Sequence, residues 1–203
     1  MIYSGRGYRH TYALRRNIAY NLQYIEYLDR TVQDLKLSEV LVTQTWKTLV
    51  ITGSGVVECL LNYLLIARGL QAKSEWELVV VAPGNQKIME GESRKVDSYI
   101  YRKRPSPTNS QMTFDAMLKK AKSKKILGTA PNLYSDLDRL RPLRNRVHLQ
   151  QISSDFDTDY NAFNWNDAVT MARVVKEIFT SNIFRPSAAE IKYFNYLNRY
   201  FET

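Results

Sequence analysis

The chain has 203 residues, of which 44% are hydrophobic, and this is enough for one globular domain with a proper core. Its 29 Lys and Arg residues against 20 Asp and Glu residues give a formal net charge of +9 at pH 7, which favours a polyanionic partner: nucleic acid, an anionic membrane surface or an acidic protein. A basic protein that is merely soluble is the alternative. The single cysteine, Cys59, excludes an internal disulfide and favours a reducing compartment, so we expect a cytoplasmic protein.

The sequence contains no signal of a membrane protein or an exported one. The N-terminal residues lack the apolar stretch of a signal peptide. No window reaches about 18 uncharged apolar residues, so no membrane span is predicted.

The first half of the chain predicts two long helices. Over residues 12–35, apolar side chains recur at steps of three and four, which forms one helical stripe. Residues 39–68 are apolar on nearly every face, which is typical of a central helix. The small residues of TGSGVVE, at 52–58, favour a close approach of two helices or a local kink over a phosphate-binding loop, because the Lys-Ser/Thr of a P-loop is missing.

A small β insertion is predicted next, at 75–110, because β-branched residues precede the turn signal Pro83-Gly84 and an alternating segment follows it. A helix then begins at Thr113 and stops at Gly128. It carries Lys119, Lys120 and Lys122, which form either a solvated face or a surface for an RNA backbone.

The last part of the chain predicts further helices. An apolar stripe runs from Leu133 to Val147, another helix covers 164–183, and an aromatic tail helix covers 185–203 and packs on the bundle or on a second subunit. The expected fold is all-α: a single domain over 1–203, built as an up-and-down helical bundle of four to five helices with a small β-hairpin-like insertion.

The segment RPLRNRVHLQ, residues 141–150, is the candidate site. If the helix continues through it, Arg141, Arg144, Asn145 and His148 share an arc of roughly 60° at the edge of the apolar stripe. Pro142 either kinks this helix or begins a new one. The segment is either a basic surface with a structural histidine or the cationic half of a site that cleaves phosphodiesters.

The residue types fit RNA cleavage by transesterification. Such cleavage needs a base for the 2′-hydroxyl, an acid for the leaving 5′-oxygen and positive charge for the phosphorane; histidine and arginine supply these. No metal or other cofactor is expected, because the sequence offers no His/Cys/carboxylate cluster for a metal. Glu58 of the central helix is expected to pair with Arg144 or Arg141, either as an orienting partner or as a purely structural ion pair.

The helical layout and the Arg–polar–His segment resemble the HEPN superfamily. The resemblance implies a metal-independent endoribonuclease of a toxin–antitoxin or phage-defence system, which cleaves RNA in a cleft between two subunits of a homodimer. It implies His148, Arg144 and Arg141 as catalytic residues, Asn145 and Arg146 as substrate-positioning residues, and a cognate antitoxin or another defence protein as a partner. The family's arginine maps to Arg144, which has the expected Asn145 but only three residues before His148, or to Arg141, which has the expected spacing but is followed by Pro142. The alternative is a degenerate, non-catalytic HEPN-like module that binds RNA or protein.

Overall fold

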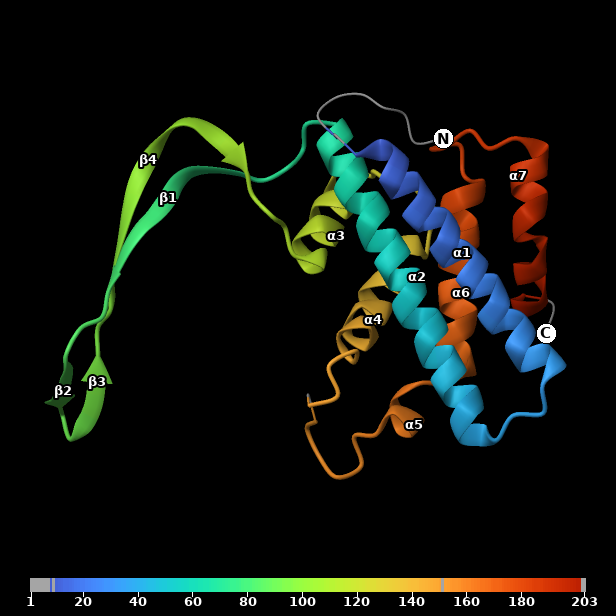
Figure 1. The fold of residues 1–203 in the computed structure, drawn as a ribbon, viewed down its shortest axis with the longest axis horizontal. Helices are drawn as coiled ribbons and strands as arrows, with labels where there is room; N and C mark the ends of the chain where they lie inside the picture. Colours follow the sequence, from blue (N-terminus) through green and yellow to red (C-terminus); the bar gives the residue numbers. More distant parts are fainter. Residues whose placement is uncertain (1–7, 9, 151, 202–203) are drawn as a thin grey trace. The chain divides into compact units, whose positions relative to one another are not determined.

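The computed structural model describes residues 8, 10–150 and 152–201, and the chain divides into two compact units. Residues 1–70 and 113–203 form the helical unit, and residues 71–112 form the ribbon unit. Figure 1 shows the helices of the first unit and the two-stranded ribbon of the second.

The described part of the chain holds seven α-helices, one 3-10 helix and four strands, so the fold is mixed. The expected all-α class, an up-and-down bundle of four to five helices, is therefore wrong. The strands account for the difference, because they form two separate sheets in a unit of their own instead of a minor addition to a bundle. In the helical unit, three short helical segments add to the longer helices: α5 (Asp159–Ala162), α7 (Ala188–Tyr193) and η1 (Phe194–Tyr200).

Helix α2 (Glu39–Ala67) is the centre of the helical unit. It contacts α1 (Thr11–Asp34), α3 (Phe114–Ser123), α4 (Leu133–Asn145), α5 (Asp159–Ala162) and α6 (Trp165–Thr180). The apolar stripe of α1 is buried as its spacing predicts. Helix α2 is also long and apolar enough to cross a membrane. The core helix of a soluble protein has the same length and composition, and 61% of the most apolar window of α2 is buried inside the helical unit, so these properties are weak evidence for a membrane span.

Gly53 explains the small residues in the middle of α2, which is an unbroken helix through 52–58. A Cβ atom at Gly53 would lie 2.5 Å from the sulfur of Met171 on α6, and Met171 has no exposed surface. At Gly55, a Cβ atom would meet nothing within 4 Å. Of these two glycines, only Gly53 is therefore needed for the close approach of α2 and α6.

We expect Gly53→Ala to lower the free energy of unfolding by about 1–3 kcal/mol, because the extra methyl group overpacks the contact with Met171. Gly55→Ala is the matched control and should raise it by up to about 1 kcal/mol, because alanine favours a helix and the site is open. Denaturant unfolding of the full chain measures both. Equal effects of the two substitutions would contradict the assigned contact.

The C-terminal tail packs on the helical unit, not as one long helix but as α7 (Ala188–Tyr193) followed by the 3-10 helix η1 (Phe194–Tyr200). The ring of Tyr200 stacks on Trp165 of α6 at 4.9 Å between centroids. Arg199 reaches Asp29 of α1. Residues 202–203 of the expected tail helix lie outside the described residues.

The ribbon unit consists of two antiparallel pairs in series: β1 (Lys73–Ala82) with β4 (Ser98–Asn109), and β2 (Gln86–Met89) with β3 (Glu92–Lys95). Glu90 and Gly91 form the two-residue turn between β2 and β3, and both have positive φ, as a type I′ turn requires. Gly84 lies where the chain passes from β1 to β2, and a Cβ atom there would be 1.8 Å from the carbonyl oxygen of Val96. Only glycine fits at that approach.

Candidate functional site

Helix α4 passes through Pro142 and ends at Asn145. The alternative in which Pro142 begins a new helix is therefore wrong. Beyond Asn145 the chain turns, with the backbone N–H of His148 donating to the carbonyl oxygen of Asn145 at 3.2 Å. His148 is exposed and lies outside the helix, so the expected helical arc that included it is wrong.

Arg144 is held on the surface of the helical unit by Glu58 of α2. Its Nη2 donates to Oε2 of Glu58 at 2.7 Å, and both side chains are partly exposed. Its Nη1 also donates to Oδ1 of the adjacent Asn145 at 3.4 Å. Of the two arginines proposed as partners of Glu58, the structure selects Arg144.

Cys59, next to Glu58, is half-buried. Burial raises the pKa of the Cys59 thiol, and the charge of Glu58 raises it further. A thiol with a raised pKa is a poor nucleophile at neutral pH.

Arg141, Lys119 and Lys122 belong to a second set of ion pairs, on the surface of α3 and α4. Arg141 pairs with Asp115, which also pairs with Lys119 at 2.8 Å. Lys122 pairs with Asp138 of α4 at 3.3 Å. Lys120 lies on the same helix and is half-buried. Arg141, Lys119 and Lys122 are therefore partly neutralised, and Arg141 contacts a different carboxylate from Arg144.

Arg146 contacts the acidic loop that follows the candidate segment. Its Nη1 donates to Oδ1 of Asp157 at 2.5 Å, and Asp159 lies 3.8 Å from its Nε. Asp159 in turn accepts from Lys47 of α2 at 2.5 Å and from Gln44 at 3.4 Å. The cations of Arg146 and Lys47 and the carboxylates of Asp157 and Asp159 thus form one cluster, which joins the end of α4 and the acidic stretch to α2.

The electrostatics of this cluster keep both carboxylates charged. The pKa of Asp157 falls from 3.8 to about 2, because the backbone N–H and the hydroxyl of Ser153 donate to it and Arg146 adds a charged hydrogen bond. Burial raises the pKa of Asp159, but the hydrogen bonds from Lys47 and Gln44 and the two nearby cations outweigh burial, and the net shift is downward.

We expect the loop around Asp157 to loosen in acid. Because the pKa of Asp157 is lower in the folded chain than its ordinary 3.8, its stabilising contribution is complete above about pH 4 and is lost as the pH falls toward 2. Hydrogen exchange of residues 152–158 should therefore be faster at pH 2.5 than at pH 5, beyond the intrinsic change with pH. Asp157→Asn should remove protection already at pH 5, whereas Asp155→Asn, in the same loop, should not. Equal protection in the two variants would contradict this assignment.

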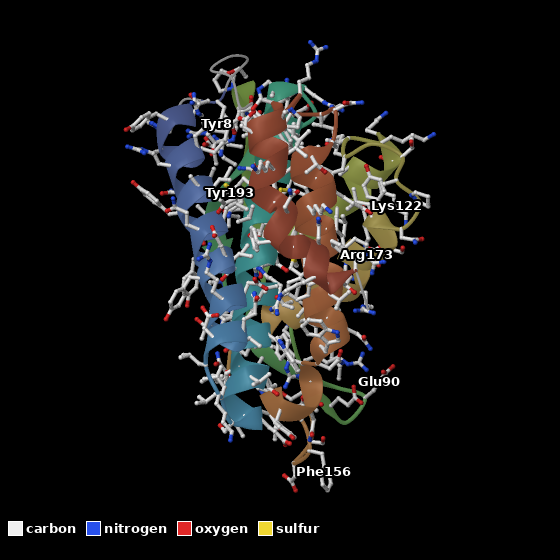
Figure 2. The ribbon with its side chains drawn as sticks, turned by 90° about the vertical axis from the view of Figure 1, so that its right-hand side faces the viewer. Tyr8, Glu90, Lys122, Phe156, Arg173 and Tyr193 are labelled. Carbon is white, nitrogen blue, oxygen red and sulfur yellow. The ribbon has the colours of Figure 1, made fainter. Side chains whose placement is uncertain are left out.

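His148 and Arg146 line one small cavity of about 190 Å³ with Asp157, Thr158 and Asp159. Around it, the loop exposes apolar side chains that have no cover in the described structure: Val147, Leu149, Ile152 and Phe156. Phe156 is 82% exposed and projects from the lower end of the helical unit (Figure 2). Exposed apolar residues grouped on one loop mark a contact surface.

The structure therefore brings together part of the predicted set. Glu58, Arg144 and Asn145 form one linked group, and Arg146 and His148 line a cavity directly beyond it. Arg141, Lys119, Lys120 and Lys122 lie on the α3–α4 surface instead.

Sequence reasoning missed Lys47, Asp157 and Asp159. Lys47 stands in an apolar helix and is only 8% exposed. A lysine in such a setting requires an acidic partner, and the sequence SSDFDTDYN was the acidic stretch available to supply it.

The residues that the structure describes contain no group of three or more His, Cys, Asp or Glu side chains placed to hold a metal ion. The chain matches no protein-family model, no curated protein and no solved structure.

Proposed function

We propose that this protein is a metal-independent endoribonuclease of the HEPN type, with its site at the end of α4 and in the loop that follows. The observation that carries the proposal is the Glu58–Arg144 pair at 2.7 Å, with the exposed His148 four residues after Arg144 in the chain. The pair holds a partly exposed guanidinium on the same short segment of chain as an imidazole that is open to solvent. This combination supplies fixed positive charge and a group that transfers protons near neutral pH.

A second copy of the chain completes the proposed site. One histidine cannot be base and acid at once, and the exposed apolar residues of the loop beside His148 supply a surface for a second copy. Two such loops in contact bring two His148 side chains to one cleft, in an isologous arrangement.

The proposed reaction is transesterification within the RNA. The 2′-oxygen attacks the phosphorus and gives its proton to one His148, which must be neutral. The bond between phosphorus and the 5′-oxygen breaks, and the second His148, protonated, gives its proton to the leaving oxygen. The products are a 2′,3′-cyclic phosphate and a 5′-hydroxyl, and Arg144 stabilises the charge that builds up on the phosphorane.

Glu58 and Asn145 act through Arg144 in this scheme. Glu58 accepts from Nη2 of the guanidinium and Asn145 accepts from Nη1, and the N–H groups that neither of them engages are left for phosphate oxygens. Glu58→Gln should therefore lower kcat for RNA cleavage more than it raises KM, because a less firmly held Arg144 stabilises the charge on the phosphorane less well.

The direct test is incubation of the full chain with single-stranded RNA in excess EDTA. We expect cleavage, with product ends that carry a 2′,3′-cyclic phosphate and a 5′-hydroxyl. Absence of cleavage, or cleavage that EDTA abolishes, would overturn the proposal.

A non-catalytic RNA-binding module is the second candidate, and a specific observation favours it. Arg146 is engaged by two carboxylates, so the cavity next to His148 is not strongly cationic. If this function is correct, neutral substitutions of Lys119 and Lys122 weaken RNA binding more than His148→Ala does, and affinity falls steeply with salt.

A further inference from the structure

The ribbon unit has no core. None of residues 71–112 is buried, although the structure describes all of them. A two-stranded ribbon is marginally stable in water, because ordering the backbone costs more free energy than the exposed side chains return. The pairing of β1 with β4 therefore requires contact with another protein surface or ligand that covers the two strands.

The register of β1 and β4 divides the ribbon into two different faces. Residues directly opposite each other point to the same face, and successive residues alternate. An irregularity between Leu78 and Val80 adds one residue to β1 and shifts this alternation. On one side, which we call the aromatic face, lie Trp76, Leu78, Val81, Tyr99, Tyr101 and Lys103.

The opposite face, which we call the paired face, carries ion pairs. Glu77 pairs with Arg102 at 2.5 Å and with Arg104 at 3.5 Å. Val80 and Ile100 lie beyond this group on the same side. Arg102 and Arg104 are therefore both paired with a carboxylate.

We propose that the aromatic face packs against the aromatic face of a second copy of this chain. It carries only one charge, Lys103, whereas the chain as a whole carries +9, so this is a surface on which two copies meet with little repulsion. Every copy presents the same face with the same length and pattern, which suits an isologous contact about a two-fold axis. Two twisted ribbons packed face to face form a small sandwich, with sheets about 10 Å apart.

The size of the face agrees with a specific contact. Its five apolar residues are each about half exposed: Trp76, Leu78, Val81, Tyr99 and Tyr101. An aromatic side chain has roughly 200 Å² of surface, so the face offers on the order of 500 Å² per copy. Two faces together bury about 1,000 Å², the lower bound for a biological interface.

RNA fits this face less well than a second copy does. Stacking of bases on aromatic rings is accompanied by free cations along the backbone path. Here Arg102 and Arg104 lie on the paired face and contact Glu77, and aliphatic Leu78 and Val81 lie directly opposite Tyr101 and Tyr99. The composition is that of a protein contact.

The test is disulfide cross-linking between copies of the full chain in a Cys59→Ser background. Single cysteines replace Leu78, Val81 or Tyr101 on the aromatic face, and Val80 or Ile100 on the paired face as matched controls. We expect at least one aromatic-face cysteine to form covalent dimers at least tenfold faster than either control. Rates that do not differ between the faces would overturn the proposal.

Sedimentation of the full chain without RNA gives a second measurement. The double substitution Trp76→Ser with Tyr101→Ser should weaken self-association by about tenfold or more, whereas Val80→Ser with Ile100→Ser should not. If neither pair changes association, the proposal is wrong, and RNA quenching of fluorescence that Trp76→Phe removes would show that the face binds RNA instead. None of these residues belongs to the His148 site, so RNA cleavage in EDTA reports separately on the proposed function.

Discussion

His148→Ala is expected to lower the rate of RNA cleavage by about 10²–10⁴-fold, the usual contribution of a positioned acid or base. In the proposed reaction, each of the two imidazoles moves one proton, and an alanine side chain moves none. His148 is exposed and lies in a turn beyond α4, so its removal leaves the helical unit intact. RNA affinity and the unfolding transition should therefore change little.

The other histidine of the chain is the matched control. His10 precedes α1, is exposed and makes no side-chain cap hydrogen bond. His10→Ala should leave cleavage unchanged. Full activity in His148→Ala, or an equal loss in both variants, would eliminate the proposed chemistry.

Arg199→Leu is expected to lower the free energy of unfolding by about 3–5 kcal/mol, because it leaves a buried charge without its partner. Asp29 is 1% exposed. Its Oδ1 accepts from Nε of Arg199 at 2.6 Å, and its Oδ2 accepts from Gln33 at 2.6 Å. The pair joins the C-terminal η1 to α1 over 170 positions of the sequence.

Two further variants test that interpretation in denaturant unfolding. Asp29→Leu combined with Arg199→Leu should recover most of the loss, because no unpaired charge remains. Arg30→Leu removes an exposed arginine that pairs with Glu26 on α1, and should cost less than about 1 kcal/mol. An effect of Arg199→Leu no larger than that of Arg30→Leu would contradict a structural role for the buried pair.

The helices of the first half could be predicted from sequence because local periodicity alone defines them. The stripe through Leu14, Ile18 and Leu22 repeats at helical spacing and is buried as expected. Glu58 was recognisable for a chemical reason, since a carboxylate in an apolar helix needs a cation. Which of Arg141 and Arg144 pairs with Glu58 depends on the angle between α2 and α4, and no local sequence pattern encodes that angle.

The end of α4 could not be predicted for a similar reason. Val147 continues the apolar spacing of the helix, yet it is half exposed. Pro142 lacks the N–H that would hold its turn of helix. Arg146 is also drawn to Asp157, a residue of the following loop. A contact between segments therefore decided where the helix stops and where His148 lies.

The insertion at 75–110 was placed nearly correctly, since the ribbon unit covers 71–112. The fold class was wrong because the local patterns that mark the strands do not show that their two sheets form a unit separate from the helices.

The central claim is that two copies of the chain share one cleavage site, and mixed subunits test it most directly. Wild type and His148→Ala are co-refolded at equal amounts, so that the copies pair at random, and the cleavage rate is measured in EDTA. If both imidazoles are needed, only pairs with two wild-type copies are active, and the rate per total protein is about one quarter of the wild-type rate. A rate of about one half would mean that each copy cleaves on its own, and the shared site would be contradicted.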